Sequence, residues 1–162
     1  MELSIAAFTR VSERQYQEDS ASFPDRLPLA EIPSPRRATE GSAGYDFACP
    51  VAGTVAPGEA RVVPTGFRAL MEPGWVLVVC PRSSLGRKYG MRLANTVGVI
   101  DSDYALADNE GHMMMAVTNG GDKPLTLNPG DRFCQGIFLP FGIAEEETVT
   151  AQRTGGYGST GA

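Results

Sequence analysis

Two aspartates, Asp101 and Asp103, follow a short apolar run and come directly before an aromatic ring, Tyr104. At the two-residue periodicity of a strand, their carboxylates would share one face. Such a pair can orient a water molecule as a general base, or it can hold a metal ion. An exposed Asp-Ser-Asp turn has the same sequence pattern. The spacing alone does not indicate which aspartate would be the base.

Arg82, Ser83 and Ser84 follow the apolar run 75–80 and open a predicted helix over residues 83–89. Two serines at a helix start are good caps. Together with the backbone N–H groups and the guanidinium, their hydroxyls could bind an anion. The alternative interpretation is an ordinary helix cap beside a surface arginine.

Three further segments combine glycine with polar side chains. Asp46 follows small residues that permit close backbone approach, although a glycine turn would look similar. Residues 129–135, which include Gln135, also fit a turn followed by a strand. Residues 153–161 offer Arg153, hydroxyls and glycine N–H groups that could cradle phosphates. They lack the Gly-Lys-Ser/Thr ending of a P-loop, and a disordered tail is the alternative.

The composition bounds the class of protein. The 162 residues suffice for one domain with its own core, and 19 glycines and 12 prolines predict many turns and favour an all-β fold. The net charge of −5 argues against a general nucleic-acid binder, so a polyphosphate ligand would need locally placed cations. Three cysteines without metal-ligand spacing predict buried, reduced thiols in a cytoplasmic protein. Neither a leader peptide nor a membrane span is predicted.

Short apolar runs separated by turn signals indicate a β-sandwich or barrel. We expect one domain over residues 1–143, in which residues 1–32 form a strand and helix extension, and a mobile polar arm over residues 144–162. Residues 20–40 are expected to form an extended loop. A brief helix capped by Ser12 is predicted over residues 12–19. The predicted strands are 4–11, 61–70 (interrupted by Pro64 and Gly66), 75–80, 113–117, 125–127 and 132–139.

Taken in order, the five segments resemble the five motifs of the homotrimeric dUTPase family, over about residues 33–162. The matching residues are Ala43-Gly44-Tyr45-Asp46, Arg82-Ser83-Ser84-Leu85, Gly98-Val99-Ile100-Asp101-Ser102-Asp103-Tyr104, Gly130-Asp131-Arg132 with Gln135, and Arg153 with Gly155-Gly156-Tyr157-Gly158-Ser159-Thr160-Gly161.

This resemblance implies a distorted β-barrel or jelly-roll-like fold with one short helix and a flexible C-terminal arm. It implies a homotrimer with shared active sites. The acidic charge and the lack of a predicted span lead us to expect that it binds no nucleic acid and no membrane. The resemblance also implies Mg²⁺-dependent hydrolysis of dUTP to dUMP and pyrophosphate, which limits uracil in DNA and supplies dUMP for thymidylate synthesis. Two alternatives share the scaffold: a nucleotide-binding regulator and an enzyme related to dCTP deaminase. The Asp101 segment and the glycine-rich tail favour a dUTPase.

The resemblance also implies roles for individual residues. Asp101 would activate the attacking water, and Tyr104 would pack on the deoxyribose and exclude a 2′-hydroxyl. Asp46 would support Mg²⁺ through its water shell. The remaining expected substrate contacts are Asn95 and Gly98 in the uracil-binding hairpin, Arg82, Ser83, Ser84 and Gln135 on the phosphates, Tyr157 stacked on uracil, and Arg153, Gly158, Ser159 and Thr160 in the segment that closes over the distal phosphates.

The chain departs from the family pattern after Tyr104. About five residues, around 105–109, look like an insertion at a hairpin end, and Glu110-Gly111-His112 stands where Arg-Gly-Glu is usual. His112 is the only histidine, and we favour a structural role for it over a catalytic one. Tyr157 replaces the usual phenylalanine, and its ring can still stack.

Overall fold

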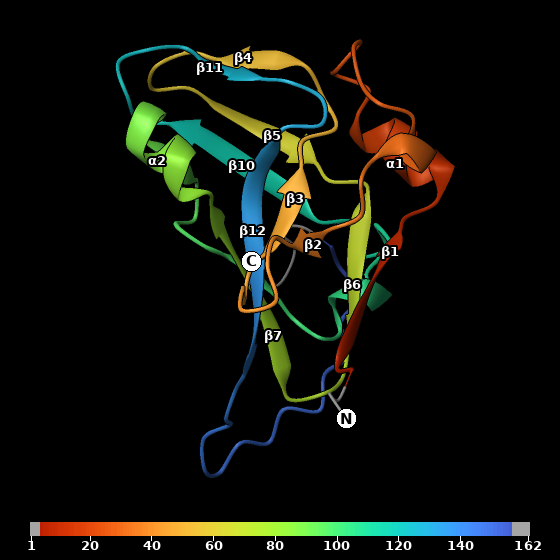
Figure 1. The fold of residues 1–162 in the computed structure, drawn as a ribbon. Helices are drawn as coiled ribbons and strands as arrows, with labels where there is room; N and C mark the ends of the chain where they lie inside the picture. Colours follow the sequence, from red (N-terminus) through yellow and green to blue (C-terminus); the bar gives the residue numbers. More distant parts are fainter. Residues whose placement is uncertain (1–3, 157–162) are drawn as a thin grey trace.

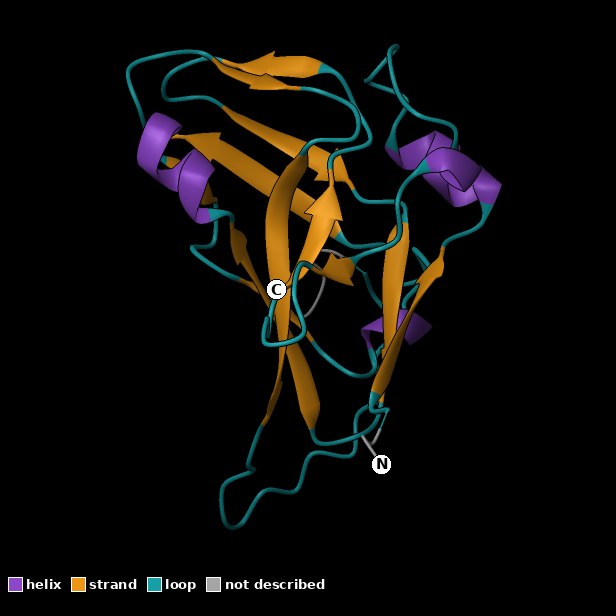
Figure 2. Cartoon of the chain, in the orientation of Figure 1, coloured by secondary structure: helices purple, strands orange, loops and turns teal. Residues whose placement is uncertain are grey.

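The computed structural model describes residues 4–156, which form a strand-rich fold with helices at its edges (Figures 1 and 2). None of the described helices is long and apolar enough to cross a membrane. The helical elements are α1 (Glu13–Asp19), η1 (Leu29–Glu31), α2 (Ser83–Tyr89) and η2 (Tyr104–Leu106). The strands are β1 (Ala6–Arg10), β2 (Arg36–Arg37), β3 (Tyr45–Ala48), β4 (Gly53–Val55), β5 (Ala60–Pro64), β6 (Phe67–Met71), β7 (Trp75–Pro81), β8 (Met91–Leu93), β9 (Gly98–Ile100), β10 (Met114–Asn119), β11 (Leu125–Leu127) and β12 (Arg132–Pro140).

A five-stranded sheet of order β2-β3-β12-β7-β9 forms the frame of the described chain (Figure 1). Its longest pairing joins β12 to β7, antiparallel from Cys134↔Pro81 to Pro140↔Trp75. A three-stranded sheet, β5-β10-β8, and the pairs β1-β6 and β11-β4 complete the described strands. The predicted all-β class is therefore confirmed.

Two details of the predicted fold differ from the structure. Within residues 4–156 the four sheets stay separate instead of closing into one barrel. This part of the chain has two α-helices, both predicted from the sequence, whereas the family resemblance implied only one short helix. Ser12 caps α1 as its sequence predicted, since its hydroxyl accepts the Gln15 N–H at 3.1 Å.

Several strand boundaries also differ from the prediction. The apolar run 61–70 is two strands, β5 and β6, because Gly66 takes a left-handed φ of 80° and turns the chain between them. The predicted loop 20–40 contains η1 and β2. Strands β3, β4, β8 and β9 were not among the predicted strands, since each is only three or four residues long and gains its order from a neighbouring strand.

The core lies between the sheets and includes Phe47, Leu77 and Phe133, all nearly inaccessible to solvent. The three cysteines are free: Cys49 and Cys134 are buried as expected, but Cys80 is only partly buried. Burial raises the pKa of Cys49 to about 11 and also raises that of Cys134, so both thiols stay protonated near neutral pH.

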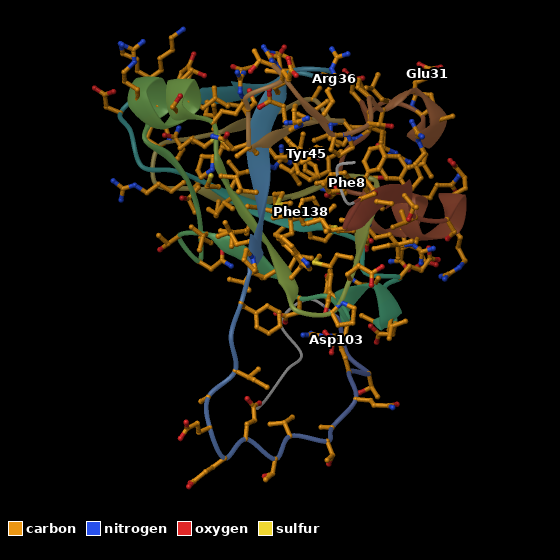
Figure 3. The ribbon with its side chains drawn as sticks, turned by 60° about the horizontal axis from the view of Figure 1, so that its bottom comes forward. Phe8, Glu31, Arg36, Tyr45, Asp103 and Phe138 are labelled. Atoms are coloured by element: carbon orange, nitrogen blue, oxygen red, sulfur yellow. The ribbon has the colours of Figure 1, made fainter. Side chains whose placement is uncertain are left out.

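The N-terminal extension packs onto the central sheet. β1 pairs along its whole length with β6. The Phe8 ring of β1 lies 5.4 Å from Tyr45, 5.4 Å from Phe47 and 5.6 Å from Phe138, measured between ring centroids (Figure 3). Residues 4–19 therefore belong to the same folded unit as the motifs.

His112 is fully buried and joins α1 to the turn at Gly66. The Gly66 N–H donates to Nε2 at 2.8 Å, so Nε2 carries no proton. The proton must be on Nδ1, which donates to Asp19 Oδ2 at 2.5 Å. Burial lowers the pKa of His112, against the opposing effects of the Asp19 hydrogen bond and the charges of Asp19 and Glu110. These contacts support the structural role that we favoured.

The lowered pKa of His112 predicts a pH-dependent stability. Below pH 6.5 the unfolded chain takes up a proton that the folded chain resists, so the free energy of unfolding should fall as pH drops from 6.5 to the lowered folded pKa. This group contributes a slope of at most about 1.4 kcal/mol per pH unit. His112→Gln should abolish the contribution while keeping an acceptor for the Gly66 N–H. Urea unfolding midpoints of both proteins between pH 5 and pH 8 measure it; parallel pH curves would contradict the assignment.

Candidate active site

The third motif forms a hairpin held at the edge of the central sheet. β9 pairs antiparallel with β7, from Val79↔Gly98 to Leu77↔Ile100. Thr96 takes a positive φ of 73° in the turn that precedes β9. Directly after β9, the Tyr104 N–H donates to the Asp101 carbonyl at 3.1 Å as the chain enters η2. Sheet pairing therefore fixes where Asp101 and Tyr104 lie.

A pocket of about 360 Å³ opens between this hairpin and β10. Its volume falls in the range of small-molecule sites, and its wall combines apolar strand residues with a few polar groups. Eight residues or motif positions singled out from the sequence line it: Asn95, Gly98, Val99, Ile100, Asp101, Tyr104, Arg153 and Gly156.

Tyr104 is 8% exposed. Its hydroxyl contacts the loop of residues 105–112, which follows Tyr104 in the chain. The hydroxyl donates to the His112 carbonyl at 3.0 Å and accepts a hydrogen bond from Asn109 Nδ2 at 2.9 Å. The sequence indicated an aromatic ring at this place but gave no sign of these two partners.

Arg153 brings the C-terminal segment back to the hairpin of its own chain. Its Nη2 donates to Asp101 at 2.6 Å and its Nε to Asp103 at 2.9 Å. The hydrogen bond to Asp103 and the two negative charges raise the Arg153 pKa further. We expected Arg153 over distal phosphates; here the same guanidinium neutralises the aspartates.

A second group of site residues lies around Asp46 of β3. Its carboxylate is 3.2 Å from Arg82 Nε and 2.9 Å from Arg132 Nη1, and the Asp46 side chain is only 10% exposed. Gln135 is the register partner of Asp46 on β12. The first, second and fourth motifs thus meet at one place, and Arg132 joins them although it was not among the predicted ligands. Its place in the Gly130-Asp131-Arg132 motif was the available signal.

Gly44 and the serines complete this second group. A Cβ at Gly44 would lie 2.6 Å from Gln135 Oε1, so a side chain at this position would displace the Gln135 amide. Ser83 and Ser84 are exposed in the first turn of α2, beside Arg82. Arg82, rather than a serine, is the N-cap and makes no side-chain cap bond, which corrects the predicted serine cap.

The two groups lie apart in one chain. Ile100, which precedes Asp101, pairs with Leu77 of β7. Arg82 directly follows the end of β7 and is five residues beyond Leu77. At about 3.3 Å per residue this separation is roughly 16 Å. The pocket beside the hairpin is lined by none of Asp46, Arg82 and Gln135. Arg82, Ser84 and Arg132 line a different pocket of about 330 Å³.

Four of the predicted site residues have no described position. Tyr157, Gly158, Ser159 and Thr160 lie outside the described residues. Among residues 4–156, no three histidine, cysteine, aspartate or glutamate side chains gather closely enough to hold a metal ion by themselves.

A strand-rich scaffold with a pocket of about 360 Å³, a carboxylate pair and a separate arginine group has the parts that a hydrolase of phosphorylated substrates needs. The model of the dUTPase family matches residues 30–161. The deoxyuridine 5′-triphosphate nucleotidohydrolase of Lactococcus lactis subsp. lactis is 48% identical over 136 residues, which cover 82% of this chain and 91% of that protein. The chain therefore belongs to the dUTPase family, and it hydrolyses dUTP to dUMP and pyrophosphate.

Solved structures agree with this assignment. The crystal structure of the Streptococcus mutans dUTPase superposes with a TM-score of 0.69 at 35% identity and covers 86% of this chain and 98% of its own. A mutant dUTPase from phage phi11 of S. aureus, with a coordinated structural Mg(II) ion, shares the fold at a TM-score of 0.67 and 17% identity, over 91% of this chain and 98% of its own.

The ion pairs of Asp46 predict what its charge contributes. Asp46→Asn keeps the shape but leaves Arg82 and Arg132 without a shared carboxylate, so their guanidinium groups should separate. We expect kcat/KM for dUTP to fall about 10- to 100-fold while the chain stays folded, because side-chain placement is worth that much in catalysis. Steady-state kinetics and thermal melting measure both, with the exposed Asp122→Asn as the matched control. Unchanged kcat/KM in Asp46→Asn would show that the arginines hold their positions alone.

Proposed function

We propose that each active site of this dUTPase is built from more than one chain of a homotrimer, with Asp101 as the general base. The observation that supports this is the separation of roughly 16 Å along β7 between Asp101 and Arg82. A general base must lie within about 3 Å of the proton that it accepts, directly or through one water. Since the phosphate-binding group of the same chain is too far away, a second chain supplies it.

The pocket beside the hairpin takes the nucleoside. Backbone groups around Asn95 and Gly98 pair with the edge of uracil, and a buried set of such groups rejects analogues strongly because a wrong edge leaves them unpaired. The buried Tyr104 ring packs on the deoxyribose, where an additional 2′-hydroxyl would clash. Tyr157, carried by the C-terminal arm, stacks on the base.

The group around Asp46 takes the phosphates. Arg82, Ser83, Ser84 and Gln135 provide a cation, hydroxyls and an amide, and the Asp46 carboxylate orients the Arg82 guanidinium. The protein is acidic overall, with a net charge of −5, so these placed cations supply the local attraction for a triphosphate.

Mg²⁺ fits this site as an ion carried by the substrate. Magnesium commonly binds through one or two carboxylates, substrate phosphates and several waters. The described residues offer Asp46 in that role, through waters, and no cluster of three protein ligands. When bound, the ion offsets phosphate charge and so permits nucleophilic attack. The phage phi11 dUTPase, which shares the fold, coordinates a structural Mg(II) ion.

The reaction begins when Asp101 is released from Arg153. In the structure this guanidinium occupies the carboxylate that must accept a proton. A bound triphosphate offers Arg153 stronger acceptors, so Arg153 moves to the distal phosphates with Gly158, Ser159 and Thr160. Asp101 then takes a proton from a water molecule that attacks the α-phosphorus, and pyrophosphate leaves.

Residues 144–162 act as the arm that makes this movement, beside a single domain over residues 1–143. Residues 144–156 contain no helix or strand and residues 144–152 are all exposed, so few packing contacts hold the first part of this segment. We also place the enzyme in the cytoplasm, consistent with its three free cysteines.

Shared sites predict that two inactive variants rescue each other. Asp101→Asn removes the base, worth about 10²–10⁴ in rate, and Arg82→Ala removes the phosphate cation. Each homotrimer should be nearly inactive. Co-expressed chains should form trimers in which roughly a quarter of the sites combine an intact Asp101 with an intact Arg82 from a different chain. Light scattering confirms the trimer and pyrophosphate release measures activity; mixed trimers no more active than their parents would place the whole site in one chain.

The position of Tyr104 predicts its effect on sugar selection. Tyr104→Ala opens the space that excludes a 2′-hydroxyl, so the ratio of kcat/KM for dUTP over UTP should fall at least about 10-fold. Leu106→Ala, at a side chain that is 77% exposed in the same helical turn, is the control and should leave the ratio unchanged. If Tyr104→Ala keeps the wild-type ratio, another residue reads the sugar.

A further inference from the structure

The helix α1 and the loop of residues 105–112 are held together by two polar contacts far apart in the sequence. α1 lies outside residues 30–161, the part of the chain that the family model matches. The loop is the part of the third motif that departs from the family pattern. A helix outside the matched family region and a loop that departs from the family pattern are therefore in contact next to the active site.

The first contact joins the start of α1 to Glu110. The N–H and hydroxyl of Ser12 donate to the two carboxylate oxygens of Glu110 at 2.7 and 2.6 Å. These two hydrogen bonds lower the Glu110 pKa, so the carboxylate is ionised at neutral pH. Glu110 has a positive φ of 59°, an unfavourable conformation for a residue with a side chain. The contact with Ser12 helps to hold it there.

The second contact joins the end of α1 to His112. Asp19 accepts from Nδ1 of this buried ring, while Gln15 Nε2 donates to the same Asp19 oxygen at 2.9 Å. The other ring nitrogen accepts the Gly66 N–H. The His112 side chain is thus fixed from both sides, and with it the position of its backbone.

The backbone of His112 in turn holds Tyr104. Its carbonyl accepts the Tyr104 hydroxyl, and Asn109 donates to the oxygen of the same hydroxyl. Gly111, with a φ of 70°, closes the loop so tightly that a Cβ there would lie 2.7 Å from the Tyr104 carbonyl oxygen. A continuous series of contacts therefore runs from Asp19 through His112 to the Tyr104 hydroxyl.

We propose that α1 positions the sugar-selecting ring: Asp19 and Ser12 hold residues 105–112 so that Tyr104 stays against the deoxyribose. Asp19 and Glu110 are positioning residues, since neither lines the pocket. The inference rests on the proposed role of Tyr104. A steric clash excludes the 2′-hydroxyl only while the Tyr104 ring stays in place, because a ring that moves aside admits UTP.

The loop also touches the C-terminal segment. A Cβ at Gly156 would lie 2.8 Å from Asn109 Oδ1 and 3.0 Å from Asp108 Oδ1. Residues 105–112 thus contact Tyr104 on one side and the glycine-rich motif on another. A loop that is held in place by α1 presents a defined surface to both.

The test compares Asp19→Ala with Glu18→Ala, which removes a neighbouring exposed carboxylate of the same helix that pairs with Arg14. Because a hydrogen bond of this kind is worth a few-fold in an equilibrium, Asp19→Ala should lower the dUTP/UTP ratio of kcat/KM about 3- to 10-fold. Glu18→Ala should leave the ratio unchanged. Asp19→Asn, which keeps an acceptor for Nδ1–H, should restore most of it. Assays at a temperature well below each melting midpoint exclude unfolding as the cause.

A double-mutant cycle decides whether Asp19 acts through Tyr104. Tyr104→Phe removes the hydroxyl that the His112 carbonyl holds, so adding Asp19→Ala to it should lower the ratio little further. Additive effects would overturn the proposal, as would an unchanged ratio in folded Asp19→Ala. Glu110→Gln offers an independent variant at the other contact and should act in the same direction.

Hydrogen exchange separates failure of this proposal from failure of the assigned sugar contact. The amides of Ala107, Glu110 and His112 are hydrogen-bonded within the loop, and Asp19→Ala should speed their exchange about 3- to 10-fold. If Tyr104→Ala leaves the ratio unchanged, the assigned sugar contact is wrong, whatever the exchange shows. If the ratio depends on Tyr104 but these amides exchange at wild-type rates in Asp19→Ala, α1 does not hold the loop and the proposal is wrong.

Discussion

The antiparallel pairing of β7 with β12 and β9 is the constraint on which both parts of the site depend. Its inner face is buried at Leu77 and Val79, so a shift of one residue in register would bring polar side chains into the core. Gly136 of β12 is packed so tightly that a Cβ would lie 2.8 Å from Leu77. Since this register is fixed, the position of the hairpin and that of the arginines follow, and so does the distance between them. An active site shared between chains is then a consequence of strand geometry.

The charged side chains of the site follow one pattern, in which carboxylates hold the arginines. An acidic chain that must bind a triphosphate needs cations held at chosen places, and each relevant arginine here is held by a carboxylate. Asp46 orients Arg82 and Arg132, while Asp101 and Asp103 hold Arg153. In each pair one side chain keeps 30% to 53% of its surface exposed, so solvent weakens the contribution to folding and the value of the pair lies in orientation. A carboxylate that holds an arginine can also release it to a stronger acceptor, which makes the Arg153 contact compatible with a mobile arm.

The sequence predicted what depends on local pattern. The helix over residues 83–89, the strand that begins at Trp75 and the Ser12 cap follow from apolar runs, turn residues and capping chemistry, and the structure confirms them. It did not predict the four short strands β3, β4, β8 and β9, which gain order only from partners, or the split at Gly66. In the site, the motif residues were recognisable in order, but contacts between distant segments were not. Arg153 on Asp101, Glu110 on Ser12 and His112 on Asp19 join residues about 50 to 100 positions apart, and no local pattern encodes such pairings.

These distant pairings converge on Tyr104, and the reason is physical. dUTP differs from UTP only in lacking the 2′-oxygen, so no hydrogen bond to that position can favour dUTP. A steric clash with the additional oxygen of UTP can reject it, provided that the clashing ring does not move. Tyr104 begins the helical turn η2, in the connection between β9 and β10, where backbone order is ordinarily lower than in a strand. The sheet fixes its N-terminal side through Ile100. Its C-terminal side has no strand beside it until β10, and there the side chains of α1 replace the missing sheet contacts. The helix α1, which lies outside the region that the family model matches, thereby limits the movement of Tyr104 through hydrogen bonds to the following loop.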